Sequence, residues 1–188
     1  MPIIAAVQIN GSSNIEKNLS STERLVRAAA KAGAEFIATP EATTYLGPHD
    51  KKIQLAEPLD GPTHERLARL AKDLSITLLV GSVAERLDDT KAYNTSLLFG
   101  PDGNLIAHYR KMHLFDVDLA ASGGVRFKES DTTGRGADLV VADTAVGRVS
   151  APSSLRIGVA MQVRFSDKRR EKSKENERKK GRWADFFC

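Results

Sequence analysis

Two glutamates and one lysine of this sequence have side chains that could take part in acid–base chemistry. Glu41 directly follows the apolar stretch FIATP, Lys111 lies in YRKMH, and Glu129 lies in RFKES. A carboxylate can accept and return a proton, and an ammonium group in a dry site can stabilise a developing oxyanion. Each residue alone is also typical of a solvated surface, so the elements that position them must decide between the two interpretations.

Other catalytic chemistry has weaker support. His113 could act as a base, although a histidine held by a backbone carbonyl is the more common case. The four histidines and the single cysteine show no metal-ligand spacing, and no glycine-rich phosphate loop follows a predicted strand. We therefore expect no cofactor and no metal ion.

Predicted strands and helices alternate in the first part of the chain. Apolar, β-branched stretches predict buried strands at 3–9, 34–42 and 76–85, and helical spacing of apolar residues predicts helices over 14–32 and from Thr63 onward. Glu41 then lies at the carboxyl end of a strand of parallel type, where ligands bind in open α/β sheets. The stretches 43–62 and 115–136 are predicted as loops, and loops of this length are usually functional.

Lys111 belongs to the second arm of a predicted hairpin. The turn signal PDGN at 101–104 separates AYNTSLLFG from LIAHYRKMHL. Alternation would place Tyr109, Lys111 and His113 on one face, but both faces mix polar and apolar residues. A lysine in water on an edge strand and a lysine that serves a reaction both fit this pattern. The order of elements indicates a mixed α/β sheet with helices on at least one face.

Composition indicates one globular domain with a basic tail. The chain has 188 residues, 41% hydrophobic and 28% charged. Its net charge of +4 comes from residues 164–182, which hold ten Lys or Arg and four Asp or Glu, whereas the remainder holds 18 basic and 20 acidic residues. We therefore do not expect nucleic-acid binding by the folded part. With no bilayer-spanning stretch and no signal peptide, we expect a cytoplasmic protein without membrane contact.

Several stretches together resemble the nitrilase, or carbon–nitrogen hydrolase, superfamily. They are AAVQI, TPEATTYLG, GPTHERLARLAKDLSITLLVGS, YNTSLLFGPDGNLIAHYRKMHLFDVD, and FKESDTT followed by VVADTAVGRV, in that family's order and spacing. The resemblance covers residues 1–149, and YRKMHLFDVD looks most like the branch of deaminated-glutathione amidases and ω-amidases. It implies an αββα sandwich, in which two sheets pack together with helices outside.

The resemblance also implies roles for the charged residues. In this family a glutamate, a lysine and a cysteine act on the carbon of an amide or nitrile. Glu41 matches the glutamate that takes the thiol proton and returns it to the departing amine, and Lys111 matches the lysine that faces the oxyanion. Glu129 matches a second glutamate that orients the site. A small amide is then the expected substrate, and the three side chains should converge on one cleft.

The cysteine of the family pattern is missing. It should follow TAVGRV within a few residues, in a stretch that commonly reads Gly-Leu-x-Ile-Cys-Tyr-Asp, where this chain reads SAPSSLRIGVAMQ. Direct continuation from Val149 places Ser154 at the nucleophile position, whereas an insertion of SAPSSLRI places Gln162 there. No histidine is placed to activate Ser154, and Cys188 follows a charged tail, so neither is expected to act as the nucleophile.

These observations divide the chain into three parts. Residues 1–149 are predicted to form an incomplete carbon–nitrogen hydrolase-like domain, residues 150–165 an aberrant linker or strand, and residues 166–188 a charged, disordered tail. The strands and helices expected after the cysteine are absent, so we expect a truncated fold and an inactive thiol amidase. The alternative is a non-catalytic interaction protein. Such a protein would associate with a homologue or with itself, or bind an acidic partner through the basic tail.

Overall fold

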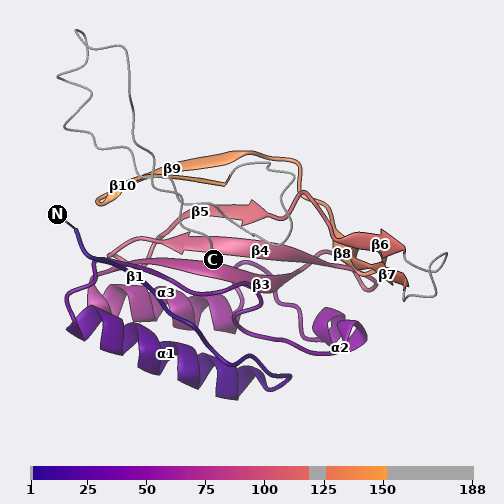
Figure 1. Cartoon of the computed structure of the whole chain (residues 1–188), viewed down its shortest axis with the longest axis horizontal. Helices are drawn as coiled ribbons and strands as arrows, with labels where there is room; N and C mark the ends of the chain where they lie inside the picture. Colours follow the sequence, from indigo (N-terminus) through magenta and orange to yellow (C-terminus); the bar gives the residue numbers. More distant parts are fainter. Residues whose placement is uncertain (1, 119–125, 152–188) are drawn as a thin grey trace, which may run out of the picture.

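The computed structural model describes residues 2–118 and 126–151, and a six-stranded mixed sheet forms its centre (Figure 1). Parallel pairs join β1 (Ile4–Ala6), β2 (Phe36–Ala38) and β3 (Thr77–Arg86). Antiparallel pairs join β3 to β4 (Ala92–Phe99) and β4 to β5 (Leu105–Arg110). The short strand β8 (Thr133–Gly134) pairs with β4. The predicted hairpin around PDGN is therefore confirmed.

Two amphipathic helices, α1 (Ile15–Lys31) and α3 (Pro62–Leu74), cover one face of this sheet (Figure 1). The side chain of Asn14 caps α1 by accepting a hydrogen bond from the Lys17 N–H. Helix α3 begins one residue before the predicted Thr63, because Pro62 already has the backbone angle that a first helical turn requires. The main core lies between helices and sheet and includes Leu19, Val26, Ile37, Leu67, Leu70, Leu78, Val80 and Leu97. Burial of each large side chain stabilises the fold by about 1.5–3 kcal/mol.

The opposite face of the sheet packs against a hairpin of β9 (Val140–Thr144) and β10 (Gly147–Ala151) (Figure 1). Successive side chains of a strand point to opposite faces of the sheet. In each central strand, one set of alternate residues therefore faces the helices and the other set faces this hairpin. This second core contains Phe36, Ala38, Leu79, Leu98, Ala142 and Val149. The described residues thus form three layers: helices, sheet and hairpin. The predicted mixed α/β architecture with helices outside a sheet is confirmed.

Some details differ from the sequence predictions. The segment 43–62 contains helix α2 (His49–Gln54), which has no buried residue and therefore no apolar spacing to reveal it. The segment 115–136 contains β6 (Asp116–Asp118), β7 (Arg126–Lys128), the 3-10 helix η2 (Glu129–Asp131) and β8. The first strand is not buried, because β1 lies at the edge of the described sheet, and Ile3 is 53% exposed. Strand β10 continues through Ser150 and Ala151, the first residues of the stretch predicted as an aberrant linker or strand.

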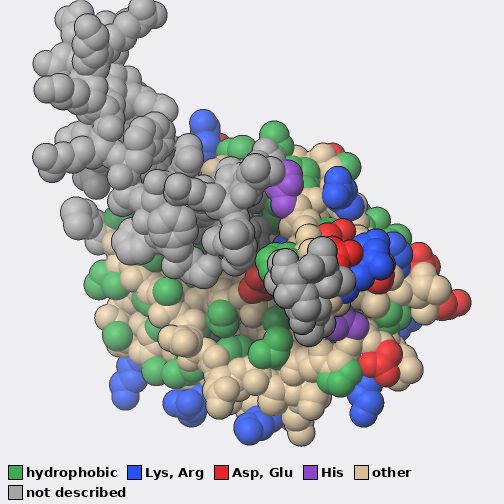
Figure 2. All heavy atoms as spheres, turned by 45° about the vertical axis from the view of Figure 1, so that its right-hand side comes forward, with side chains coloured by type: hydrophobic (Ala, Val, Ile, Leu, Met, Phe, Trp, Pro, Cys, Tyr) green, Lys and Arg blue, Asp and Glu red, His purple; other side chains and the backbone are tan. Residues whose placement is uncertain are grey.

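The positions Ser154, Gln162 and Cys188 and the predicted disordered tail 166–188 lie outside the described residues. Of the helices that the structure describes, none has the length and apolar character needed to cross a membrane. On the face drawn in Figure 2, Lys and Arg side chains are spread along the lower edge, and others lie beside acidic side chains at the right.

Candidate active site

Glu41, Lys111 and Glu129 converge at one end of the sheet. The Nζ atom of Lys111 lies 3.1 Å from Oε1 of Glu41 and 3.0 Å from Oε2 of Glu129. The exposed fractions of the side chains are 13% for Lys111, 32% for Glu41 and 10% for Glu129. Pairs with so little contact with water are screened much less than surface pairs. The predicted convergence is confirmed, and the interpretation of Lys111 as a lysine in open water is wrong.

These three residues are called the ionic trio below, and its two carboxylates belong to the wall of a cleft of about 310 Å³. A volume near 300 Å³ is typical of sites for small ligands. Glu41 and Glu129 both line the cleft, and so do Asn94, Tyr93 and Lys52. The carboxylates of the trio are therefore accessible from a cleft large enough for a small substrate.

A tight turn after β2 positions Glu41. Ala42 has a left-handed backbone with φ 56°, and its N–H donates to Oγ of Ser82 at 2.8 Å. The Thr43 N–H donates to the Ser82 carbonyl oxygen at 2.9 Å. Within the turn the hydroxyls of Thr39 and Thr43 lie 2.7 Å apart. The turn is thus hydrogen-bonded to β3, which holds in place the backbone from which the Glu41 side chain extends.

Gly81 allows this turn to lie against β3. A Cβ atom at Gly81 would lie 2.3 Å from the carbonyl oxygen of Thr39 and 2.4 Å from the carbonyl carbon of Pro40, both of which are backbone atoms. We expect Gly81→Ala to lower the free energy of unfolding by about 1–3 kcal/mol, because the turn must move to make room. Urea denaturation measures this loss. The matched control is Gly11→Ala, whose Cβ would meet only the side chain of Leu46, at 3.3 Å. Equal stability of the two variants would contradict the account.

The sequence predicts Lys111 within the second strand of the hairpin, but in the structure Lys111 lies directly after the end of β5. Its N–H donates to the carbonyl oxygen of Asn94 at 2.8 Å, and its carbonyl oxygen accepts from the Gly136 N–H at 2.9 Å. A Cβ atom at position 136 would lie 2.1 Å from the carbonyl oxygen of Arg110, so only glycine allows this approach. The backbone of Lys111 is therefore held on both sides.

The charges of the trio keep Lys111 protonated. Burial lowers the pKa of the Lys111 ammonium, but the nearby carboxylates of Glu41 and Glu129 outweigh this effect, and the pKa is raised. At neutral pH the site therefore presents a positive charge between two carboxylates.

A second ion pair fixes the end of β5 next to Lys111. Arg110 forms a two-pronged ion pair with Glu85, which is buried, and its guanidinium carbon lies 4.3 Å from the centre of the Tyr93 ring. The hydroxyl of Thr95 also donates to Glu85, at 2.7 Å. Burial raises the pKa of Glu85, but the bonds from Arg110 and Thr95 outweigh it, so the pKa is lowered. Glu85 is thus charged in the folded protein.

We expect Glu85→Gln to lower the free energy of unfolding by about 2 kcal/mol at pH 7. This loss is smaller than for a fully buried ion pair, because the Arg110 side chain is partly exposed to water. The pKa of Glu85 is lower in the folded than in the unfolded chain, so its contribution is present above the ordinary value of 4.5 and is lost as the pH falls through the folded pKa. Urea denaturation at pH 7 and pH 3 should show the difference between variant and wild type shrinking in acid. A difference of the same size at both pH values would contradict the ion pair.

The structure adds two residues that sequence reasoning missed. The Nδ2 atom of Asn94 donates to Oε1 of Glu41 at 2.7 Å, and its Oδ1 is buried without a hydrogen-bond partner among the described residues. Lys52, on α2, donates from Nζ to Oγ1 of Thr133 at 3.0 Å and lines the same cleft. By contrast, His113 is exposed and is not among the residues that line the cleft.

The arrangement fits chemistry at a carbonyl carbon. The carboxylate of Glu41 can accept a proton, and the ammonium of Lys111 can stabilise negative charge on an oxygen. Within residues 2–118 and 126–151, no group of three or more His, Cys, Asp or Glu could hold a metal ion. No cysteine occurs there either, because Cys188 is the only cysteine of the chain.

The sequence of this chain is similar to sequences of known proteins. The carbon–nitrogen hydrolase family model matches residues 3–162. Omega-amidase NIT2 of Xenopus tropicalis is 37% identical over 153 residues, which are 80% of this chain and 51% of the relative. The chain spans about half the length of the curated relatives it matches.

Solved structures show the same fold. The NitFhit protein of C. elegans has a TM-score of 0.70 and 29% identity, over 79% of this chain and 37% of that one. Nit3 of Saccharomyces cerevisiae, described as a member of branch 10 of the nitrilase superfamily, has a TM-score of 0.65 and 28% identity, over 79% of this chain and 53% of that one. From its sequence match and its fold, this chain belongs to the carbon–nitrogen hydrolase family and is similar to ω-amidases.

Proposed function

We propose that this chain binds a small ω-amide acid at the ionic trio and does not hydrolyse it. The observation that supports this most is the trio itself, in which one ammonium pairs with two carboxylates beside a cleft of about 310 Å³. The family chemistry needs a thiol as well, and the sequence holds none before Cys188. Recognition of the amide is therefore retained while the covalent step is lost.

The trio offers a complementary partner for each polar atom of a primary amide. The ammonium of Lys111 donates to the amide oxygen, and a carboxylate of Glu41 or Glu129 accepts from the amide N–H groups. Bonds of this kind, with one charged partner, are roughly twice as strong as bonds between neutral groups. A primary amide can thus bind without any covalent step.

The missing thiol supports the second half of the proposal. The family match extends to residue 162 and so includes both positions considered for the nucleophile. One holds Ser154 and the other Gln162, and neither is a thiol. Without a nucleophile, Glu41 has no proton to take and Lys111 has no tetrahedral oxyanion to stabilise.

The choice of an ω-amide acid follows the relatives named as ω-amidases, of which this chain covers about half. Isothermal titration with the half-amide of glutaric acid tests binding. We expect saturable binding in the wild type that is about tenfold weaker in Glu41→Gln, the equivalent of one charge-assisted hydrogen bond. Glu65→Gln, which changes an exposed glutamate in the first turn of α3, should leave the affinity unchanged. Absence of binding, or equal affinity in wild type and Glu41→Gln, would overturn the proposal.

A further inference from the structure

Lys52 brings an ammonium group to the cleft that the two glutamates of the ionic trio line. It lies on α2 and lines the cleft together with Glu41 and Glu129. Its Nζ donates to the hydroxyl of Thr133 at 3.0 Å. Among the residues that the structure describes, no carboxylate lies within salt-bridge distance of this ammonium group. Lys52 therefore brings positive charge to the cleft without a direct counter-ion.

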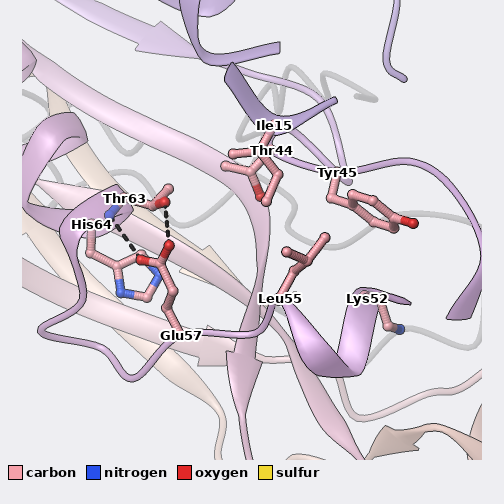
Figure 3. A pocket seen from close by; sticks show the side chains of 9 residues that line it. Ile15, Thr44, Tyr45, Lys52, Leu55, Glu57, Thr63 and His64 are labelled. Atoms are coloured by element: carbon pink, nitrogen blue, oxygen red, sulfur yellow. Dashed lines mark hydrogen bonds between the residues drawn. The ribbon is translucent and has the colours of Figure 1, made fainter. Parts of the chain in front are cut away.

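The acidic residues around Lys52 are engaged elsewhere. Glu41 and Glu129 pair with Lys111. Glu57 accepts hydrogen bonds from the N–H of Thr63 at 2.8 Å and from its hydroxyl at 2.7 Å. Figure 3 shows Glu57 turned toward Thr63, with Lys52 on the other side of the small pocket that both residues line. None of these carboxylates is free to neutralise Lys52 directly.

Lys52 is also partly removed from water. Burial lowers the pKa of its ammonium, the charge of Glu129 raises it, and the charge of Lys111 lowers it, with a net lowering. A partly desolvated cation is stabilised by an anion in direct contact. Lys52 is therefore a partly desolvated cation that can pair directly with an anionic group of a ligand in the cleft.

We infer that Lys52 binds the carboxylate of the ligand whose amide group lies at the ionic trio. This inference rests on the proposed function and extends it, because it assigns the selectivity for acids over neutral amides to one residue. The amide contacts Glu41 and Lys111, and the carboxylate contacts Lys52. A neutral amide of the same length would make only the first set of contacts.

A purely structural role for Lys52 is the competing explanation. Its bond to Thr133 joins α2 to β8, so loss of the ammonium could loosen this wall of the cleft. A loosened wall would weaken every ligand alike. A lost carboxylate contact would weaken only ligands that carry a carboxylate.

The experiment compares the half-amide of glutaric acid with its neutral diamide by isothermal titration of the whole chain. We expect the wild type to bind the half-amide at least tenfold more tightly than the diamide. Lys52→Gln should lose this preference and bind the diamide within about twofold of the wild type. The matched control is Lys51→Gln, on the exposed side of the same helix, and it should behave as the wild type.

The other outcomes separate the inference from the proposed function. Equal wild-type affinity for the two ligands would overturn the inference and leave the proposed function in place. A parallel loss of both affinities in Lys52→Gln, with a lower melting temperature, would also overturn it. Half-amide binding that depends on Lys52 but not on Glu41 would support the inference and overturn the proposed function. If neither ligand binds to the wild type, both fail.

Discussion

Protein with this sequence is expected to release no ammonia from ω-amide acids above the background rate. The route that the family resemblance implies requires a thiolate that attacks the carbonyl carbon, with Glu41 as the expected base and Lys111 expected at the oxyanion. Loss of the nucleophile from such a catalytic unit costs on the order of 10⁶ in kcat, because the remaining residues have no covalent step to assist. Ammonia release from deaminated glutathione, α-ketoglutaramate and related ω-amide acids measures the activity.

Two controls identify a nucleophile in an unexpected place. Robust release that stops when Cys188 is alkylated would show that the terminal thiol reaches the site. Release that survives alkylation but is lost in Ser154→Ala would show a serine nucleophile instead. Either result would contradict the expected inactivity.

Lys111→Met is expected to lower the free energy of unfolding by about 3 kcal/mol at pH 7. The substitution keeps much of the volume of the side chain but removes the ammonium group that pairs with both Glu41, which is 32% exposed, and Glu129, which is 10% exposed. Two partly buried carboxylates without a cation between them repel each other and destabilise the fold, whereas in the wild type the Lys111 ammonium offsets one of the two negative charges. Urea denaturation measures the loss.

The triple variant Lys111→Met, Glu41→Gln, Glu129→Gln is the matched control. Glutamine keeps an acceptor oxygen for the N–H groups of Asn94 and Phe115, which bond to the two glutamates in the wild type. It should therefore recover much of the stability that the single variant loses. A triple variant no more stable than the single one would show that packing, rather than charge, causes the loss.

The convergence of the ionic trio could be predicted from the sequence. Glu41 follows a strand, and the carboxyl end of a strand in an α/β sheet is a general place for ligands. Lys111 and Glu129 had equally common structural explanations when considered singly. The family resemblance resolved the choice, because it concerns the order and spacing of several stretches rather than any one residue.

The rest of the cleft could not be predicted, for identifiable physical reasons. Helix α2 buries no residue, so it leaves no apolar periodicity in the sequence, and Lys52 could not be assigned to any element. Asn94 was detectable in principle. In the β4–β5 register Thr95 pairs with Arg110, which places Asn94 opposite Lys111. This register includes an irregularity between Leu98 and Phe99. The PDGN turn alone does not reveal that irregularity, so the sequence could not predict the pairing.

The most direct test of binding without turnover uses the half-amide of glutaric acid labelled with ¹⁵N at its amide. The ¹⁵N resonance of the ligand is followed by NMR in the presence of the protein. The account predicts that the amide resonance shifts or broadens in proportion to the protein concentration, and that no ¹⁵N-ammonium accumulates over days. Accumulation of ¹⁵N-ammonium at a rate proportional to protein, or an amide resonance that the protein leaves unchanged, would contradict it.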